Sequence, residues 1–303
     1  MQILFLILMF IIGAIFGSFL CCQARRLHLR EEVVAQCPTR GTPERGSARM
    51  SARAPWRRER ATRPEKRRIE LPSRSICLHC HKQLKWHDNI PIISWLMLKG
   101  KCRHCHKNIG YAEIISELSL AFAFLGLGTY FLCLNNPMSA DLLSDFPTIS
   151  PMNWAIFIVT LFFTSSLAFL AIYDGIYGEL PSIGFIISAV FAIALAILSA
   201  WPNFTPMPIF SALLFGGIYL ILYLVSKGKW VGDGDWILAA IIGLALGHPW
   251  LSIIALLIAN LAACIIMFPI VKKSKNHQVY FGPFLVLGFV ITYMLSDFVM
   301  SMI

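Results

Sequence analysis

The chain has 303 residues, of which 57% are hydrophobic and only 14% are charged, and its mean hydropathy is +0.68. Soluble globular domains carry charged residues at about 25% of their positions. This composition excludes an ordinary soluble enzyme and indicates a membrane protein built from several apolar helices.

The net charge of +10 comes almost entirely from one segment. Residues 23–75 hold 15 Lys and Arg against 6 Asp and Glu, a local balance of +9. A basic tract between apolar segments is typical of a topology signal and of attraction to anionic lipid. We therefore expect contact with the lipid bilayer, with anionic lipid at this basic loop, and we expect no nucleic-acid partner.

Apolar runs of about 20 residues match a bilayer core of roughly 30 Å. The sequence predicts an all-α polytopic membrane protein with about eight transmembrane helices, and seven stays open because the sixth run is short. The predicted spans are 3–22, 113–134, 153–173, 181–200, 206–226, 236–247, 250–271 and 282–301.

The basic residues also predict the orientation of these spans. If the spans alternate in direction, all 26 Lys and Arg fall on one side of the membrane, in the connections 23–112, 227–235 and 272–281. Positively charged loops are the cytoplasmic ones. We therefore expect a periplasmic amino terminus and a large cytoplasmic loop after the first span.

That first loop has two parts. Residues 31–75 are rich in Arg, Pro, Ser, Gly and Glu and poor in apolar residues, which predicts disorder. The stretch from Ile76 to Tyr111 contains aromatic, Cys and His residues, which is typical of a small folded module. The predicted divisions are 1–22 (first transmembrane helix), 23–75 (basic, disordered cytoplasmic segment), 76–112 (cytoplasmic module) and 113–303 (transmembrane core).

Four cysteines form two Cys-x-x-Cys pairs at the spacing of a zinc ribbon. Cys77 and Cys80 are followed, after 21 residues, by Cys102 and Cys105. Two such turns supply the four thiolates of a tetrahedral zinc site, and the bound metal stabilises a module too small for a large core. We therefore predict a structural zinc ion in a small cytoplasmic module between the first and second spans.

Two alternatives stay open for these cysteines. One of four neighbouring histidines could replace a thiolate, since zinc also accepts imidazole. The two pairs could instead form disulfides, although a reducing cytosolic face disfavours them. The four histidines are His79, His81, His104 and His106.

Two aspartates stand at the predicted cytoplasmic ends of spans. Asp174 ends an apolar run, and Asp235 closes the sequence Gly232-Asp233-Gly234-Asp235 before another. Ionisable residues at membrane depth usually face a bundle interior or a water-filled cavity. Two carboxylates that converge there can divide a hydrolysis, one as the base toward water and the other as the acid. Asp174 and Asp235 are therefore the candidate catalytic pair.

A structural role is the alternative for each aspartate. An aspartate before a helix is often an N-cap, which would explain Asp235 without catalysis. Asp174 could be a solvated loop residue, and spacing alone does not bring the two together. Asp233 is expected to be solvated, or to modify its neighbour.

Five motifs follow one another along nearly the whole chain. They are Gly17-Ser18-Phe19-Leu20 with Arg26-Leu27; the cysteine segment with Asn89-Ile90-Pro91, Ser94-Trp95, Lys99-Gly100-Lys101-Cys102 and Glu117-Leu118; Asp174 with Leu180-Pro181; Gly232-x-Gly234-Asp235; and Phe281-Gly282-Pro283-Phe284. In this order they resemble the motifs of the type IV prepilin peptidases, bifunctional membrane enzymes of type IV pilus and type II secretion systems.

The resemblance implies cleavage of the short basic leader of prepilins or pseudopilins, on the cytoplasmic side and after a Gly. It further implies N-methylation of the new amino terminus with S-adenosylmethionine, in the bacterial inner membrane. Asp174 and Asp235 would be the aspartic protease pair, and no residue is assigned to the methyl donor.

Rival interpretations come from several classes. One rival is a different Gly-x-Gly-Asp intramembrane protease, either presenilin-like or a preflagellin peptidase. Tyr173-Asp174 resembles the presenilin Tyr-Asp. The four-cysteine module argues against it. The chain could also be a non-catalytic secretion-system scaffold or an inactive copy of the family. A last alternative is a transporter with an aspartate proton relay, although a transporter would more often show internal repeats.

Overall fold

The computed structural model describes residues 1–36, 77, 80, 82–85, 88, 90–135, 149–228, 231–273 and 280–302. All regular structure in these ranges is helical apart from isolated bridges. Six of the helices are long and apolar enough to cross a bilayer, so the protein is a multi-pass membrane protein. These six are α1 (Gln2–Gln36), α3 (Ala112–Asn135), α4 (Pro151–Tyr177), α5 (Ser182–Ala200), α6 (Met207–Ser226) and α8 (Pro249–Lys273).

The remaining apolar helices are too short to span singly. Helix α7 (Asp235–Leu246) has 12 residues, which is about 18 Å at 1.5 Å per residue. Helices α9 (Gly282–Met294) and α10 (Ser296–Met302) meet at a bend of 64°. All eight predicted segments are helical, but the count of eight spans is not confirmed: the described helices give six spans, or seven if the bent pair is one. Hydropathy measures apolar length and does not show where a helix ends or bends.

Helix α1 runs past the predicted boundary at residue 22. Arg25 forms an ion pair with Glu113 of α3, and His28 stacks on Tyr177 of α4 with ring centroids 3.7 Å apart. These contacts explain why the first basic residues are helical despite a composition that favours disorder. The rest of the basic segment, 37–75, lies outside the described residues.

Small residues set the closest helix contacts. A Cβ on Gly13 would come within 2.6 Å of the Leu120 carbonyl oxygen, and one on Gly17 within 2.5 Å of the Ser116 carbonyl oxygen. The spacing Gly13-x-x-x-Gly17 is that of membrane helices whose backbones pack directly together. Helix α1 is thereby fixed on α3, which the sequence analysis did not predict, although the Gly-x-x-x-Gly signal was present.

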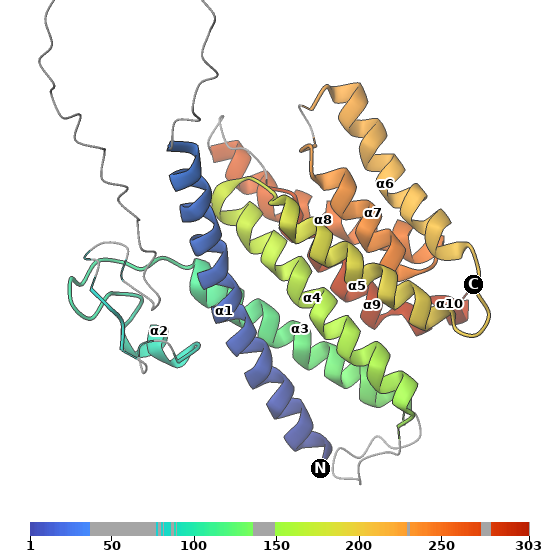
Figure 1. The fold of residues 1–303 in the computed structure, drawn as a ribbon, viewed down its shortest axis with the longest axis horizontal. Coiled ribbons are helices and arrows are strands. Elements are labelled where there is room, and N and C mark those ends of the chain that lie inside the picture. The colour runs from blue at the N-terminus through green and yellow to red at the C-terminus, as the bar shows by residue number, and fades with distance from the viewer. Residues whose placement is uncertain are drawn as a thin grey trace, which may run out of the picture.

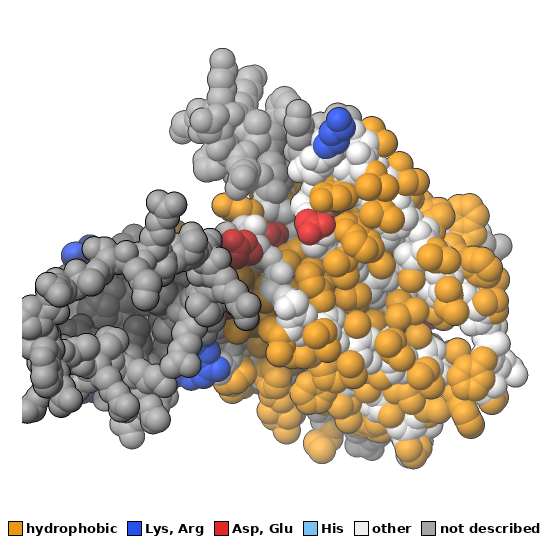
Figure 2. All heavy atoms as spheres, turned by 45° about the horizontal axis from the view of Figure 1, so that its top comes forward, with side chains coloured by type: hydrophobic (Ala, Val, Ile, Leu, Met, Phe, Trp, Pro, Cys, Tyr) orange, Lys and Arg blue, Asp and Glu red, His pale blue; other side chains and the backbone are white. Residues whose placement is uncertain are grey.

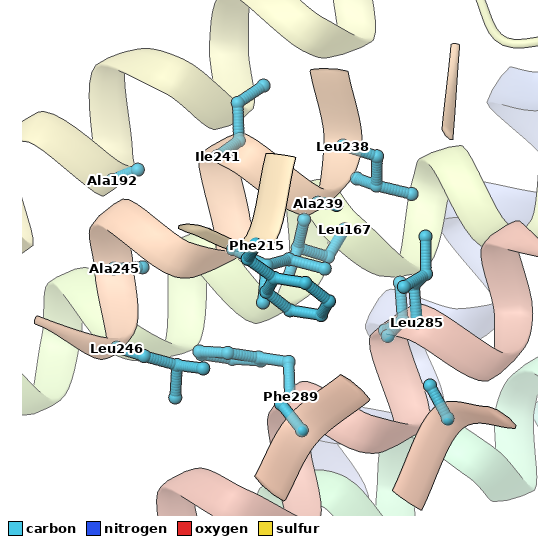
Figure 3. Packing of buried hydrophobic residues seen from close by; sticks show 14 of the residues in the cluster. Leu167, Ala192, Phe215, Leu238, Ala239, Ile241, Ala245, Leu246, Leu285 and Phe289 are labelled. Carbon is cyan, nitrogen blue, oxygen red and sulfur yellow. The ribbon is translucent and has the colours of Figure 1, made fainter. Parts of the chain in front are cut away.

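The short helix α7 is packed among α5, α6, α8 and α9. Figure 1 shows α1, α3 and α4 side by side at one side of the bundle, with α6 and α7 at the other. Figure 3 shows part of the apolar core around the ring of Phe215, to which α8 also contributes Leu251, Ala255, Ala259 and Ala263. Its labelled members come from α4 (Leu167), α5 (Ala192), α6 (Phe215), α7 (Leu238, Ala239, Ile241, Ala245, Leu246) and α9 (Leu285, Phe289).

The outer surface of the bundle is apolar. Figure 2 shows hydrophobic side chains over most of the described helical surface, with the charged side chains near its edges. Ile186, Leu213 and Ile265 are 64%, 66% and 67% exposed. An apolar surface this continuous is a site of membrane contact in a folded protein.

We predict that Gly17→Ala destabilises the bundle, because the added methyl would meet the α3 backbone, which cannot move aside. The expected loss is about 1–3 kcal/mol of unfolding free energy, the usual cost of overpacking. Thermal unfolding in detergent measures it.

Gly217→Ala is the matched control, since a Cβ at Gly217 meets nothing within 4 Å. We expect that variant to gain up to about 1 kcal/mol from helix propensity. Equal behaviour of the two variants would contradict the direct packing of α1 on α3.

Candidate active site and metal centre

Asp174 lies in the last turn of α4, where the helix ends at Tyr177. The left-handed residue Gly178 (φ 72°) closes the helix by donating its N–H to the Asp174 carbonyl oxygen, at 2.8 Å. The Asp174 side chain is turned into the bundle and is 6% exposed. This burial argues against a solvated loop residue.

The Asp174 carboxylate is held by the start of α9. Gly282 donates its backbone N–H to Asp174 Oδ2 at 2.9 Å, in a buried hydrogen bond. The positive end of the α9 dipole adds to the stabilisation of a carboxylate there. A Cβ on Gly282 would lie 2.8 Å from the same oxygen, so the approach requires glycine. The motif Phe281-Gly282-Pro283-Phe284 therefore has a physical role that the sequence pattern alone did not reveal.

Asp235 is the first residue of α7 and is also 6% exposed. Its Oδ2 accepts the backbone N–H of Gly232 at 2.9 Å. The N-cap position belongs to Gly234, and no side chain caps the helix there. The N-cap alternative for Asp235 therefore does not describe its geometry. Asp233, expected to be solvated, is exposed.

The structure brings the two aspartates to one end of the bundle. A Cβ on Gly234 would lie 2.6 Å from Leu180, so the turn before Asp235 packs against the segment that follows α4. The charge of Asp235 also acts on Asp174. Two buried carboxylates on different helices thus face a common environment, each with one backbone N–H donor. Such a pair can supply a base and an acid to one hydrolysis.

Tyr219 of α6 lies beside this site and was missed by the sequence analysis. Its buried ring is 5.5 Å from that of Phe281, whose neighbour Gly282 binds Asp174. Its hydroxyl accepts a hydrogen bond from the Asn260 side chain of α8 at 3.2 Å. An amide inside an apolar run such as α8 was the available signal, because polar residues within spans tend to be functional.

The four cysteine sulfurs form one cluster. All four lie within 4.8 Å of one another, and Cys77 Sγ is 3.9 Å from Cys105 Sγ. Tetrahedral zinc with bonds of about 2.3 Å needs sulfurs about 3.8 Å apart, so the geometry can hold a metal ion such as zinc. The disulfide alternative is not realised, because all four cysteines are free.

The two turns that present the sulfurs are built alike. Cys77 donates its backbone N–H to the Lys82 carbonyl, and Cys102 donates to the Lys107 carbonyl, both at 2.9 Å. Among the described residues the cluster contains no histidine, and His79 and His81 lie outside them.

The protonation of the thiols also suits a cation. Backbone N–H donors of Cys105 and His104 lower the pKa of the Cys102 thiol to about 6. The Lys107 N–H lowers the pKa of Cys105, but desolvation and hydrogen bonds among the sulfurs outweigh it and raise this pKa to about 11. Neighbouring thiolates repel one another, so the cluster ionises fully only when a cation is bound.

The module is attached to the membrane helices through α3. Trp95, in the short helix α2 (Ile93–Met97), donates its indole N–H to the Gly110 carbonyl at 3.0 Å. The Ile92 N–H bonds Glu117 Oε2 of α3 at 2.7 Å. Ile92 has φ 63° and ψ −53°, which is a strained turn for a β-branched residue. Asn89 of the same motif lies outside the described residues.

We predict that Cys102→Ser loses the metal, whereas the purified protein carries about one zinc ion per chain. The affinity should fall as the pH is lowered, because protons compete for the thiolates, and Cys102 joins this competition below about pH 6. Atomic spectroscopy of the purified protein gives the stoichiometry. Cys133→Ser is the control, since Cys133 is exposed on α3; equal zinc in both variants would contradict the site.

Comparisons with known proteins find relatives of one kind. The family model described as the bacterial Peptidase A24 N-terminal domain matches residues 11–131. A prepilin leader peptidase/N-methyltransferase of Dickeya chrysanthemi is 26% identical, covering 92% of this chain and 89% of that protein. A type 4 prepilin-like proteins leader peptide-processing enzyme of Escherichia coli O78:H11 is 28% identical, covering 74% and 76%.

A prepilin leader peptidase/N-methyltransferase of Vibrio cholerae is 34% identical over 21% of this chain and 30% of that protein. No solved structure gives a significant match. The family model, these relatives and the order of the motifs support the type IV prepilin peptidase family for this chain.

Proposed function

We propose that the protein is a membrane aspartic endopeptidase that removes the basic leader of type IV prepilins or type II secretion pseudopilins. The observation that carries this proposal is the pair of buried carboxylates, Asp174 and Asp235, at one end of the bundle, each with one backbone N–H donor. The names of the relatives supply the substrate class.

The reaction would take place at the cytoplasmic face of the bacterial inner membrane, with the amino terminus in the periplasm. The distribution of the basic residues supports this orientation. The stack of His28 on Tyr177 also supports it, because it places the basic end of α1 beside the end of α4 that carries Asp174. A basic leader would then stay on the cytoplasmic side while the apolar part of the substrate lies in the bilayer.

The proposed chemistry uses the two buried carboxylates, Asp174 and Asp235, and one water molecule. In the proposed mechanism one carboxyl of the pair is ionised and the other is protonated. The ionised member takes a proton from water as the oxygen attacks the scissile carbonyl carbon, and the protonated member donates its proton to the carbonyl oxygen. Collapse of the tetrahedral intermediate breaks the C–N bond: the departing amine takes a proton from the protonated carboxyl, and the ionised carboxylate takes the proton of a gem-diol hydroxyl as the carbonyl re-forms.

Methylation of the new amino terminus is the second proposed activity. It rests on the relatives named N-methyltransferases, and the methyl group would come from S-adenosylmethionine. In the described part of the chain we assign no residue to this donor. The zinc ion would have a structural role, since four thiolates leave no open coordination position.

The rival interpretations fit the site less well. A scaffold has no need of two carboxylates buried at a membrane edge, which are costly and are usually retained for function. Another Gly-x-Gly-Asp protease would not require the clustered cysteines between α1 and α3.

We predict that Asp174→Asn and Asp235→Asn each lower prepilin cleavage by about 10²–10⁴-fold, the usual contribution of a general acid or base. A gel-shift assay in membranes, with expression and zinc content checked, measures the loss. Asp233→Asn is the matched control, because Asp233 is exposed two residues from Asp235. Cleavage that survives in either active-site variant would refute the pair.

We also predict that Gly282→Ala reduces cleavage, because its Cβ would lie 2.8 Å from Asp174 Oδ2 and displace the carboxylate. The matched control is Gly175→Ala, whose Cβ makes only an ordinary contact at 3.9 Å with Pro283. Measuring kcat for both variants tests the role of the α9 start. Equal activity of the two would show that Asp174 does not depend on Gly282.

A further inference from the structure

A groove of about 380 Å³ runs between α1 and α5, with α4 as its floor. Its walls are mostly apolar, and their main members are Phe16, Leu20, Phe162, Phe169, Ile187 and Phe191. The volume lies within the range of about 300–1,000 Å³ that is usual for ligand pockets. The groove is lined by none of the residues of the carboxylate pair or the cysteine cluster.

The few polar atoms of the walls are already bonded within the protein. Ser165 donates its hydroxyl to the Leu161 carbonyl at 2.8 Å, and Ser166 donates to the Phe163 carbonyl at 2.7 Å. The Ser166 oxygen also accepts the hydroxyl of Ser188 of α5 at 3.0 Å. These walls therefore suit a hydrocarbon chain better than a polar ligand.

One end of the groove is cationic. Gln23, Arg26 and Arg30 line it from α1, on the stripe that continues the apolar Phe16 and Leu20. Arg25, on another face of α1, forms an ion pair with Glu113 of α3. Along α1 the lining is apolar up to Leu20, and the basic residues Arg26 and Arg30 follow, with the apolar Leu27 between them.

The basic end of the groove lies at the same end of the bundle as Asp174, because His28 stacks on Tyr177 there. This is a membrane edge, where arginine side chains reach lipid headgroups. The order of apolar wall and basic rim matches the order of acyl chain and phosphate in a phospholipid. We propose that the groove binds an acyl chain of one anionic phospholipid, whose phosphate is held by Arg30 at the basic end.

A substrate helix fits this groove less well. The basic leader of the proposed substrate would meet the two arginines, and like charges repel. An acyl chain is thinner, and an anionic headgroup is attracted.

The test measures lipid retention by the full chain in detergent, using native mass spectrometry with phosphatidylglycerol or phosphatidylcholine. We expect one phosphatidylglycerol per chain and weaker retention of phosphatidylcholine. Arg30→Gln should weaken phosphatidylglycerol binding about ten-fold, the usual worth of a hydrogen bond to a charged group. Ile187→Trp should reduce it by filling the groove.

Two control variants match these changes outside the groove. Lys227→Gln removes an exposed positive charge at the end of α6, and Ile186→Trp enlarges an exposed α5 residue that does not line the groove. Both should retain the lipid as the unmodified protein does. Zinc content and thermal unfolding verify that each variant is folded.

Several outcomes would overturn the proposal. Equal retention of the two lipids would show that the arginines do not select an anionic headgroup. Equal loss of lipid in the test and control variants would show that the lipid does not bind in the groove. Displacement of the lipid by glycerol phosphate would indicate a site for soluble phosphate. Crosslinking of a prepilin, rather than lipid, to a photoreactive group at position 187 would assign the groove to the substrate helix. None of these results depends on the proposed peptidase activity.

Discussion

The hydrogen bond from the Gly282 N–H to Asp174 is the contact on which the rest of the site depends. A carboxylate buried at a membrane edge needs a donor, because its loss of hydration would otherwise cost several kcal/mol. The start of α9 supplies the donor and the positive end of a helix dipole. This hydrogen bond joins the start of α9 to the end of α4.

The same demand for close approach explains how the helices pack. Lipid surrounds the bundle, so apolar contact between helices gains little over apolar contact with lipid, and association depends on tight van der Waals packing. Glycines provide it on several pairs: a Cβ on Gly216 of α6 would meet α7 at 2.6 Å, and one on Gly288 of α9 would meet α8 at 2.6 Å. Close packing of this kind holds the short α7 against α6, and α7 also contacts α5, α8 and α9. Asp235 lies in the first turn of α7.

Local patterns predicted much of this molecule. The cysteine spacing indicated a shared metal site because a Cys-x-x-Cys turn is a local structure, and the eight apolar runs are all helical. The short length of α7 agrees with the prediction of 236–247, but the bend at Leu295 was not foreseen, since it interrupts a run that remains apolar. The roles of Gly282 and Tyr219 depend on contacts between distant helices, which composition and spacing do not encode.

The helical extension of α1 shows the same limit and links the two halves of the chain. Residues 23–36 have a composition that predicts disorder, yet Tyr173 of α4 is fully buried against this helix. The Tyr173 hydroxyl donates to Glu31 Oε2 at 2.6 Å, so the proton in its 3.3 Å contact with His28 Nδ1 must come from the imidazole. Since Tyr173 directly precedes Asp174, these two contacts help to set the rotation of the last turn of α4. The basic continuation of α1 therefore packs against the end of α4 that carries Asp174.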